Sequence, residues 1–572
     1  MKERRSASQI LFGFLPEQTV DLRGGIWKVV KWRQPEPVRS IDTATLVREL
    51  RRQAAPWRES GKDGGFVADL DRGVPVRVYS LDRDAGVQVV PFPRIWHCKR
   101  CYRLTSDPGA PCPCGSSAPP GQLPFVGYCS ECGTLRQPYI KKCPEHGQHR
   151  VNWPGTASAR EIVFDCPVCA RRVQPPGLGS PNCDCGRGRI VFSVHRATSV
   201  YTPRSIVLVN PPSQERIREI AEAGGPPRAL AWVVNGMRTR RMGDSPTPIE
   251  SIRRQLSATG LAPDQIEQML RVLGSDSSDS DYVAEIPLDS PDEAERQAVS
   301  IALATSESRI TVDDLQSGLP GDSPMQSLYR TSYRQAMARA GVETVELIDR
   351  FPVMTGMFGY TRGKTEPGAS RLVAFRDSSG YVVYGDIAET EALFVRLDPM
   401  RVARWLQAQG CPLESFQSAV DARIAILRLA NRRGRMGEEA EKLLFRLVHS
   451  YCHRFIRLTA VYGGIERNAL SELVTPLHLG FFVYAAARGD FVLGGLQALF
   501  ETELDNLLQT FVEDEHRCPL DPGCDHGGGA CMACLHLGEP SCRHYNGSLS
   551  RSTLAGPGGY LHFEHQGGSA SR

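Results

Sequence analysis

Closely spaced pairs of cysteines recur through one stretch of this 572-residue chain, and they constrain its fold more than any other feature. A two-residue gap lets both thiolates of a pair reach one tetrahedral ion, and the loop that follows can return the chain to supply two more ligands. The spacing therefore predicts three structural zinc sites with closed coordination shells. We expect the quartets to be Cys98, Cys101, Cys112 and Cys114; Cys129, Cys132, Cys143 and His146; and Cys166, Cys169, Cys183 and Cys185.

The partner assignment has alternatives. Two interleaved ribbons could share Cys98 and Cys101 with Cys143 and His146, and His149 competes with His146 as a ligand. Disulfides or free buried thiols are the other interpretation of the cysteines. Because no apolar segment follows the basic N-terminus, we expect no secretory signal and a reducing cytoplasmic location, where disulfides are rare.

A second cysteine cluster lies near the C-terminus. Cys531 and Cys534 form the closely spaced pair, Cys542 is the natural third ligand, and Cys518 or Cys524 is the fourth. This pattern predicts one more structural zinc site. The chain should therefore bind about four zinc ions.

The length allows several domains, each with its own core. We predict a multidomain α/β protein in which zinc ribbons follow an N-terminal α/β segment and precede a mixed α/β core and a largely helical C-terminal zinc-binding domain. The predicted ranges are 1–90 for the α/β segment, 91–204 for three ribbons, 205–298 for a helical and linker region with an acidic Ser-rich insert (275–295), 299–400 for the core, 401–565 for the C-terminal domain and 566–572 for a disordered tail.

Periodicity predicts the individual elements within these ranges. Helices are expected at 46–52, 213–223, 325–340, 401–409, 416–431, 438–461 and 496–512. Strands are expected at 26–30, 74–79, 161–164, 345–348, 353–360, 372–375, 381–384 and 392–397. The most apolar late stretch, 481–499, is interrupted by Arg488 and Asp490, so no membrane span is predicted.

Charge permits nucleic-acid binding without requiring it. The net charge is only +4, and residues 94–204 hold fifteen Lys and Arg against six Asp and Glu, a surplus that thiolate-bound zinc would reduce. Two basic runs are candidate DNA contacts, although most such runs are solvated loops and neither contains interleaved aromatic residues. The candidate contacts are Arg240 and Arg241 in the first run, and Arg432, Arg433 and Arg435 in the second.

A catalytic alternative rests on His449 and His453, which stand four residues apart and so share one face of the helix expected at 438–461. With Glu472 or Asp490 they could form an open metal site or an acid–base pair of a metal-dependent nuclease or other hydrolase. Position 450 is Ser where the metallopeptidase signature needs Glu. Paired histidines on an amphipathic helix more often hydrogen-bond inside a core, so we predict no catalytic residues and no enzyme activity.

Two sequences resemble nucleotide-binding motifs without completing them. Gly363-Lys364-Thr365 matches the end of a P-loop, but Phe358 occupies the position where the loop needs its first Gly. The acidic run 292–295 follows Pro291 in a polar stretch, where a helicase motor would have an apolar strand. The chain alone is therefore not expected to hydrolyse ATP.

Several motifs, in order along the chain, resemble the DrmB family of the bacterial DISARM antiphage system: Arg5–Gln9, Phe92–Cys101, Phe358–Arg362 and Leu447–His453. The C-terminal part resembles the helicase-associated domain of unknown function 1998 family through Gly494–Leu496, Ala530–Cys534, Cys542 and Asn546. This resemblance implies a non-motor subunit that binds a separate DrmA-like helicase, which supplies the ATPase, and that helps it engage invading DNA. The rival hypotheses are the hydrolase and a pure protein scaffold that never contacts nucleic acid.

Overall fold

The protein is described from a computed structural model, and its chain forms two compact units. Unit 1 contains Met1–Pro211 and Met354–Ile387, and unit 2 contains Pro212–Val353 and Ala388–Arg572. The structure describes residues 13–38, 41–81, 86–153, 160–244, 265, 283, 285–305, 308–320, 323–486, 494–513, 517–526, 529–538, 541–542, 544 and 546–563.

Unit 1 begins with a three-stranded antiparallel sheet of β1 (Thr19–Leu22), β2 (Gly25–Trp32) and β5 (Val87–Pro91). Arg23 and Gly24 form the turn between β1 and β2, and both have positive φ. Two-residue turns of this kind match the right-handed twist of a hairpin. This sheet packs its apolar side chains in one cluster with residues of the chain segment 354–387.

Helices α2 (Thr43–Glu59) and α3 (Phe66–Asp71) pack on a second sheet of unit 1. The Asp42 carboxylate accepts the Thr45 N–H and thereby caps α2, and an apolar stripe that ends in Trp57 faces the sheet. This sheet contains β3 (Glu36–Pro37), β4 (Val76–Ser80), β14 (Thr202–Val209), β16 (Val373–Ala374) and β17 (Arg376–Asp377). It also includes parts of β15 (Val342–Thr361) and β18 (Gly380–Leu397), and the chain passes from one unit to the other within each of these two strands.

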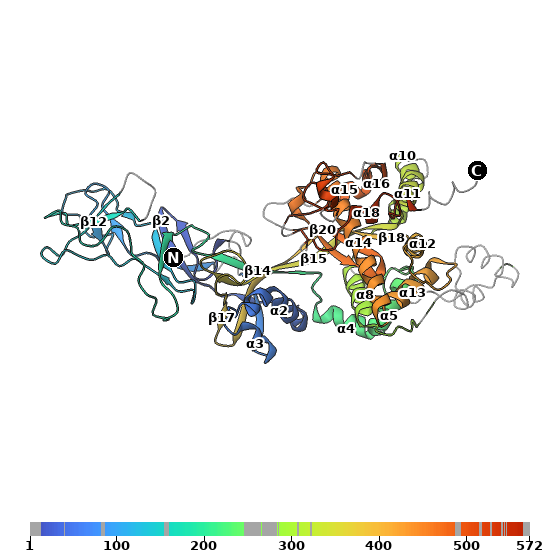
Figure 1. Cartoon of the computed structure of the whole chain (residues 1–572), viewed down its shortest axis with the longest axis horizontal. Helices are drawn as coiled ribbons and strands as arrows, with labels where there is room; N and C mark the ends of the chain where they lie inside the picture. Colours follow the sequence, from blue (N-terminus) through green and yellow to red (C-terminus); the bar gives the residue numbers. More distant parts are fainter. Residues whose placement is uncertain are drawn as a thin grey trace. The chain divides into compact units, whose positions relative to one another are not determined.

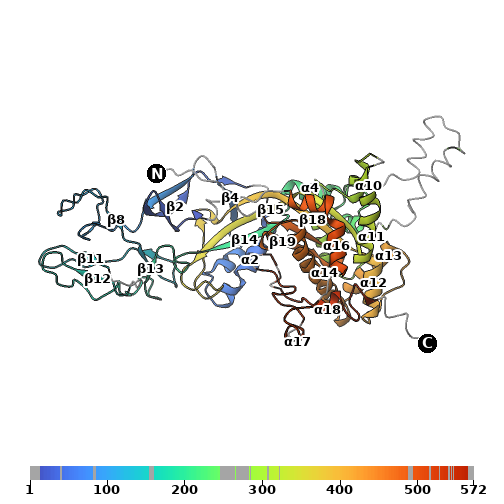
Figure 2. The same cartoon turned by 90° about the horizontal axis from the view of Figure 1, so that it is seen from above.

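The cysteine-rich part of unit 1 is built from very short strands. They are β6 (Trp96–His97), β7 (Leu104–Thr105), β8 (Gly121–Gln122), β9 (Phe125–Tyr128), β10 (Leu135–Arg136), β11 (Arg150–Asn152), β12 (Val163–Asp165) and β13 (Val191–Val194). They pair in three small sheets with the orders β7-β6-β8, β10-β9-β13 and β11-β12. In Figures 1 and 2, β11 and β12 lie at the end of unit 1 that is remote from α2.

Unit 2 is centred on the long helix α14 (Arg435–Tyr462). This helix contacts α13 (Ala419–Ala430), α16 (Leu504–Glu513), α18 (Arg551–Leu554) and the hairpin of β19 (Leu470–Thr475) and β20 (Gly480–Ala485). Figure 2 shows α14 among these neighbours. Strand β20 also pairs with Ala392–Arg396 of β18.

The other elements of unit 2 precede or follow α14 in sequence. The first are α4 (Gln214–Glu222), α5 (Gly225–Val234), α8 (Asp292–Thr305), α9 (Val312–Ser317), α10 (Pro324–Ser327), the π-helix η2 (Leu328–Tyr333), α11 (Arg334–Ala340) and α12 (Pro399–Ala408). The later ones are η3 (Arg467–Ala469), η4 (Pro476–His478), α15 (Gly495–Thr502) and α17 (Gly523–His526). No helix in the described ranges has both the length and the apolar character that a bilayer crossing needs.

The predicted class is confirmed, because the chain is a multidomain α/β protein with small sheets, a helical C-terminal region and cysteine clusters. Several element boundaries differ. The strands expected at 345–348 and 353–360 are one strand, β15, and the helix expected at 496–512 is interrupted at Glu503. The acidic linker was predicted to reach residue 295, and this end point is wrong because α8 begins at Asp292. The acidic residues in the first turn of α8 interact favourably with the positive end of the helix dipole.

Some predicted features lie outside the described residues. They are the Arg5–Gln9 motif, most of the Ser-rich part of the insert, Asp490 and the tail 566–572.

Candidate metal centres

Among the residues that the structure describes, five groups of side chains each bring four possible ligand atoms within 4.8 Å of one another. Four of the groups contain three or four cysteines, and the fifth is mixed. We name them site 1 (Cys98, Cys101, Cys112, Cys114), site 2 (Cys129, Cys132, Cys183, Cys185), site 3 (Cys143, His146, Cys166, Cys169), site 4 (Cys518, Cys524, Cys531, Cys534) and site 5 (His449, His453, Glu472, Cys542).

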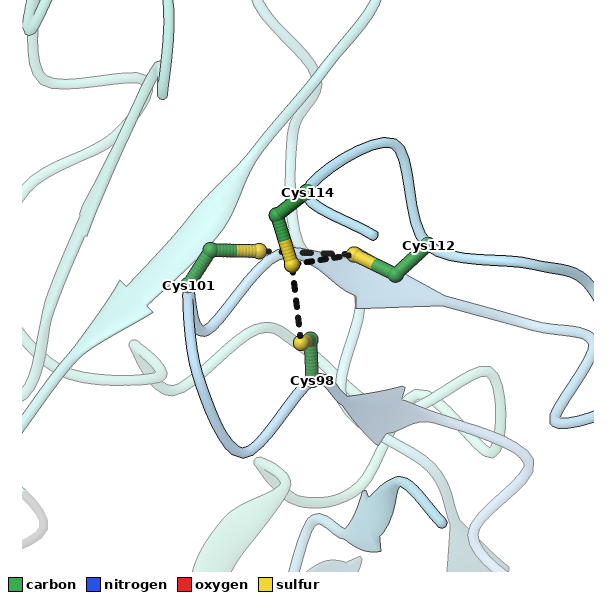
Figure 3. A group of neighbouring side chains, drawn as sticks. All are labelled: Cys98, Cys101, Cys112 and Cys114. Carbon is green, nitrogen blue, oxygen red and sulfur yellow. Dashed lines mark hydrogen bonds between the residues drawn. The ribbon is translucent and has the colours of Figure 1, made fainter. Parts of the chain in front are cut away.

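Site 1 has the composition that the sequence predicts. Figure 3 shows its four thiols pointing toward a common centre. The Sγ–Sγ separations are 3.6 Å for Cys98 and Cys114 and 3.4 Å for Cys101 and Cys112. A tetrahedral ion with Zn–S bonds of about 2.3 Å needs sulfur atoms about 3.8 Å apart, so the thiols fit a zinc ion with little movement.

The same turn shapes the first cysteine in the four ribbon pairs whose two ligands are three positions apart. In site 1, the Cys98 N–H donates to the Arg103 carbonyl, the Arg100 N–H donates to the Cys98 sulfur at 3.4 Å, and Tyr102 has positive φ. The residue four positions after the cysteine is also left-handed in the pairs that begin at Cys129, Cys143 and Cys166, where it is Gly133, Gly147 and Ala170. Each pair is therefore a preformed half-site, and any two pairs could combine around one ion.

Sites 2 and 3 correct the predicted quartets. Cys129 and Cys132 were assigned to Cys143 and His146, but they lie beside Cys183 and Cys185, with Sγ separations of 3.8 Å for Cys129–Cys185 and 3.6 Å for Cys132–Cys183. The reason is strand pairing. Strand β9, which precedes Cys129, pairs with β13, which follows Cys185, and Tyr128 lies opposite Val191.

Site 3 is formed within the chain segment that separates the two halves of site 2. Strand β11 follows the pair Cys143 and His146, and its antiparallel partner β12 precedes the pair Cys166 and Cys169. Arg150 and Asp165 lie opposite each other in this pairing and form an ion pair at 2.6 Å. His146, rather than His149, joins the site, because the His149 ring instead contacts the Lys141 carbonyl.

Backbone N–H groups prepare some of these thiols for metal binding. The Cys101 and Arg100 N–H groups lower the pKa of Cys98 to about 6, against burial, which raises it. The Arg187 N–H lowers the pKa of Cys185 to about 6 in the same way. A thiolate is the form that binds a metal, so these cysteines are available as ligands at neutral pH.

Site 4 corrects the prediction for the C-terminal cluster. Both Cys518 and Cys524 join the pair Cys531 and Cys534, whereas Cys542 does not. The Sγ–Sγ separations are 3.5 Å for Cys518–Cys531 and 3.7 Å for Cys524–Cys534. Arg457 of α14 holds the loop of the pair, since it donates to the carbonyls of Met532, Ala533 and His536.

Site 5 contains Cys542 together with the two histidines that the sequence singled out. The His449 and His453 rings are T-shaped with centroids 4.4 Å apart, as expected for residues one turn apart on a helix. Glu472 of β19 lies 3.2 Å from His449 Nε2, and Cys542 Sγ lies 3.4 Å from the same nitrogen. All four side chains are buried, and neither histidine has exposed surface for a substrate to reach.

Arg362 connects site 2 to the sheet of unit 1, and sequence analysis missed this role. Its guanidinium is fully buried, donates to the carbonyls of Gly133, Val200 and Glu17, and lies over the Tyr360 ring at 4.7 Å. Gly133 is the left-handed residue that follows Cys132. An arginine directly after an apolar, aromatic strand was the available signal, because such a charge must be fully hydrogen-bonded when it is buried.

The two basic runs lie in different surroundings of unit 2. Arg240 and Arg241 are exposed, and Arg240 lines a cleft in which arginines and carboxylates are equal in number. The arginines are Arg238, Arg240, Arg309, Arg334 and Arg396, and the carboxylates are Asp313, Asp314, Glu343, Glu346 and Asp398. Arg432 and Arg433 line another cleft together with the acidic residues Asp292, Glu293, Glu438 and Glu441. Arg435 pairs with Glu439 at 2.7 Å. The cleft of the first run is therefore balanced in charge, whereas that of the second has three arginines (Arg296, Arg432 and Arg433) against four carboxylates.

Neither nucleotide-like sequence has the structure of a phosphate site. Gly363 follows strand β15, but the next element in the fully described stretch 362–374 is strand β16, so no helix N-terminus is present to hold phosphate. The acidic run 292–295 forms the first turn of α8 instead of the end of a strand.

Comparison with known proteins places the chain near one defence protein. A family model described as a domain of unknown function, DUF8724, matches residues 6–202, which include sites 1 to 3. The chain is similar to the DISARM protein DrmB of Bacillus paralicheniformis, with 23% identity over 219 residues. The match covers 35% of this chain and 38% of that protein.

Proposed function

We propose that this chain is a non-motor, zinc-binding subunit of a DISARM-like antiphage complex, and that it partners a helicase and helps it engage invading DNA. The similarity to DrmB is the observation that carries this proposal. Zinc is the proposed ion because its usual structural ligands are tetrahedral groups of four cysteines, or of three cysteines and a histidine. Sites 1 to 4 would then hold loops rigidly, with no ligand position left for substrate or water.

A separate motor is part of the proposal because the chain lacks the context for nucleotide hydrolysis at both candidate sequences. A DrmA-like helicase would supply ATP turnover, while this subunit would supply a docking surface and phosphate contacts. The run with Arg240 and Arg241 is the better candidate for those contacts, since both side chains are exposed and its cleft is balanced in charge, whereas carboxylates outnumber arginines around the second run and Arg435 pairs with Glu439.

The test is co-expression of the tagged chain with its candidate helicase, followed by co-purification, ATPase assays and DNA-binding titrations at two or more salt concentrations. We expect the chain alone to show no ATP turnover and to bind DNA weakly, and the complex to bind more tightly. Arg240→Ala with Arg241→Ala should weaken binding about tenfold and reduce its salt dependence. The double variant Arg218→Ala and Arg330→Ala, which removes two other exposed arginines of unit 2, is the control.

Two outcomes would support the rivals. DNA affinity of the complex that is unchanged when all five candidate arginines are neutralised would favour a pure scaffold. A DNA-cleaving activity that disappears in His449→Ala with His453→Ala, while the fold survives, would favour a hydrolase. Failure to co-purify with any helicase would contradict the proposed partnership.

A further inference from the structure

Four acceptor atoms face one another inside unit 2, and the hydrogen bonds around them fix this arrangement. His449 Nδ1 lies 3.0 Å from the Gly547 carbonyl, and His453 Nδ1 lies 2.9 Å from the Leu535 carbonyl. A carbonyl only accepts, so both rings donate through Nδ1 and a neutral ring directs the lone pair of Nε2 into the group. Glu472 and Cys542 add a carboxylate oxygen and a sulfur to these two nitrogens.

Two atoms of this group lack a hydrogen-bond donor when both rings are neutral. His453 Nε2 and Glu472 Oε2 are buried 3.2 Å apart, and neither makes a hydrogen bond. Unpaired polar atoms are rare in protein interiors because each costs about 1–3 kcal/mol when buried. One ion at the centre would satisfy both atoms at once.

The separations suit a tetrahedral ion. Zn–N and Zn–O bonds of about 2.0–2.1 Å require ligand atoms about 3.3–3.4 Å apart, and a sulfur ligand lengthens its contacts slightly. Glu472 lies 3.2 Å from each histidine nitrogen through its two oxygens, and the Cys542 sulfur lies 3.4 Å from His449 Nε2.

Cys542 also lies in the turn that characterises the ribbon cysteines. The His544 and Asn546 N–H groups both donate to its sulfur at 3.3 Å, and Asn546 has positive φ. In site 1, Arg100 and Tyr102 occupy the same positions relative to Cys98, two and four residues later. The backbone around Cys542 is therefore shaped to stabilise a thiolate, as it is around a cysteine of the ribbons.

We propose that His449, His453, Glu472 and Cys542 form a fifth zinc site, closed and structural, that fastens the C-terminal segment to α14 and β19. One thiolate and one carboxylate balance Zn²⁺ when both histidines are neutral, so the centre has no net charge. This balance explains how all four ligands can be buried, whereas each other site leaves at least two ligands partly exposed. Both backbone carbonyls that orient the histidines come from the same C-terminal segment. The metal ion and these hydrogen bonds would therefore hold this segment to α14 together.

The test is the metal content of the full purified chain, with any histidine tag removed, measured by plasma mass spectrometry against protein concentration. We expect five zinc ions per wild-type chain, and four in Cys542→Ser and in His453→Gln. Cys411→Ala is the control, because it removes a thiol of unit 2 that belongs to none of the five sites, and it should retain five.

Unchanged zinc content in both site variants would overturn the proposal. If those variants do not fold, the wild-type count decides, because four ions per folded chain would leave no zinc for site 5. Another transition metal in the place of the fifth zinc would overturn the assignment of zinc. None of these results depends on a helicase or on DNA. The total of five rests on the four zinc ions of the proposed function, whereas the loss of one ion in the site variants tests site 5 alone.

Discussion

The ribbons of unit 1 and the C-terminal part of unit 2 use similar ligands for different structural purposes. Around sites 1 to 3 the strands are two to four residues long, and the apolar cluster beside site 3 has only six fully buried members. Helix α14 alone buries fourteen residues against its neighbours. In the ribbons bound zinc would replace a core, whereas beside α14 it would attach a loop segment to a core that already exists.

Metal removal should show the difference between the ribbons and the C-terminal part of unit 2 most clearly. Structural zinc contributes about 10–16 kcal/mol in isolated zinc-finger peptides, which matches or exceeds the stability of a typical domain. Stripping zinc with a strong chelator should therefore abolish hydrogen-exchange protection across residues 96–195, while α14 and β20 stay protected. Exchange mass spectrometry measures both regions in one sample, and re-added zinc is the control. Equal loss in both regions would contradict the distinction.

Substitution of Arg362 tests whether this side chain anchors the ribbons to the rest of unit 1. Arg362→Met should destabilise unit 1 by about 3 kcal/mol, because three carbonyls, those of Gly133 and Val200 in buried hydrogen bonds and that of Glu17 in a partly buried one, lose their donor. Denaturant unfolding monitored by exchange or by tryptophan fluorescence checks this value. Arg171→Met is the control, since Arg171 is exposed and its pair with Glu145 should contribute less than about 1 kcal/mol. A similar effect of both substitutions would contradict the anchoring role.

A buried histidine should make unit 2 sensitive to acid in a way that does not involve metal. Burial lowers the pKa of His478 to about 4, although its Nε2 lies 2.8 Å from the Ala294 carbonyl. Its neutral form is required for folding, so stability is complete above the unfolded pKa of about 6.5 and falls as the pH drops toward 4. His478→Gln should reduce the loss between pH 7 and pH 5 by about 2 kcal/mol.

Urea unfolding of both proteins at several pH values checks this prediction. The comparison is between wild type and variant, so acid release of zinc affects both equally. Parallel pH profiles would show that His478 does not contribute.

Sequence patterns identified the ligands better than their partners. Cys98 and Cys101, like each later pair, have the close spacing that two ligands of one zinc ion need, and this requirement is local. Whether Cys129 and Cys132 combine with Cys143 or with Cys183 depends on which strands pair, and the β9–β13 contact is distant in sequence. Spacing alone could not decide between them.

The same limit explains the errors at the C-terminus. Cys542 follows Cys534 closely enough to suggest a shared ion, yet it lies with His449 and Glu472, which come from another helix and strand. The α/β class and most helices followed from periodicity, because burial of one face acts along a single segment. The role of Arg362 depends on hydrogen bonds to three carbonyls from separate parts of the chain, and no local sequence pattern predicts such a set of acceptors.

Because site 3 lies inside the chain segment that separates the two halves of site 2, zinc ions would fill the two sites in a fixed order. During synthesis, the pair Cys166 and Cys169 leaves the ribosome before Cys183 and Cys185, so site 3 has all its ligands while site 2 still has half. Folding of the β11–β12 hairpin then shortens the loop that must close across residues 133–182, which lowers the entropy cost of the second capture. Zinc should be released in the opposite order, so that site 2 loses its ion first and site 3, at the β11–β12 hairpin, keeps its ion longer.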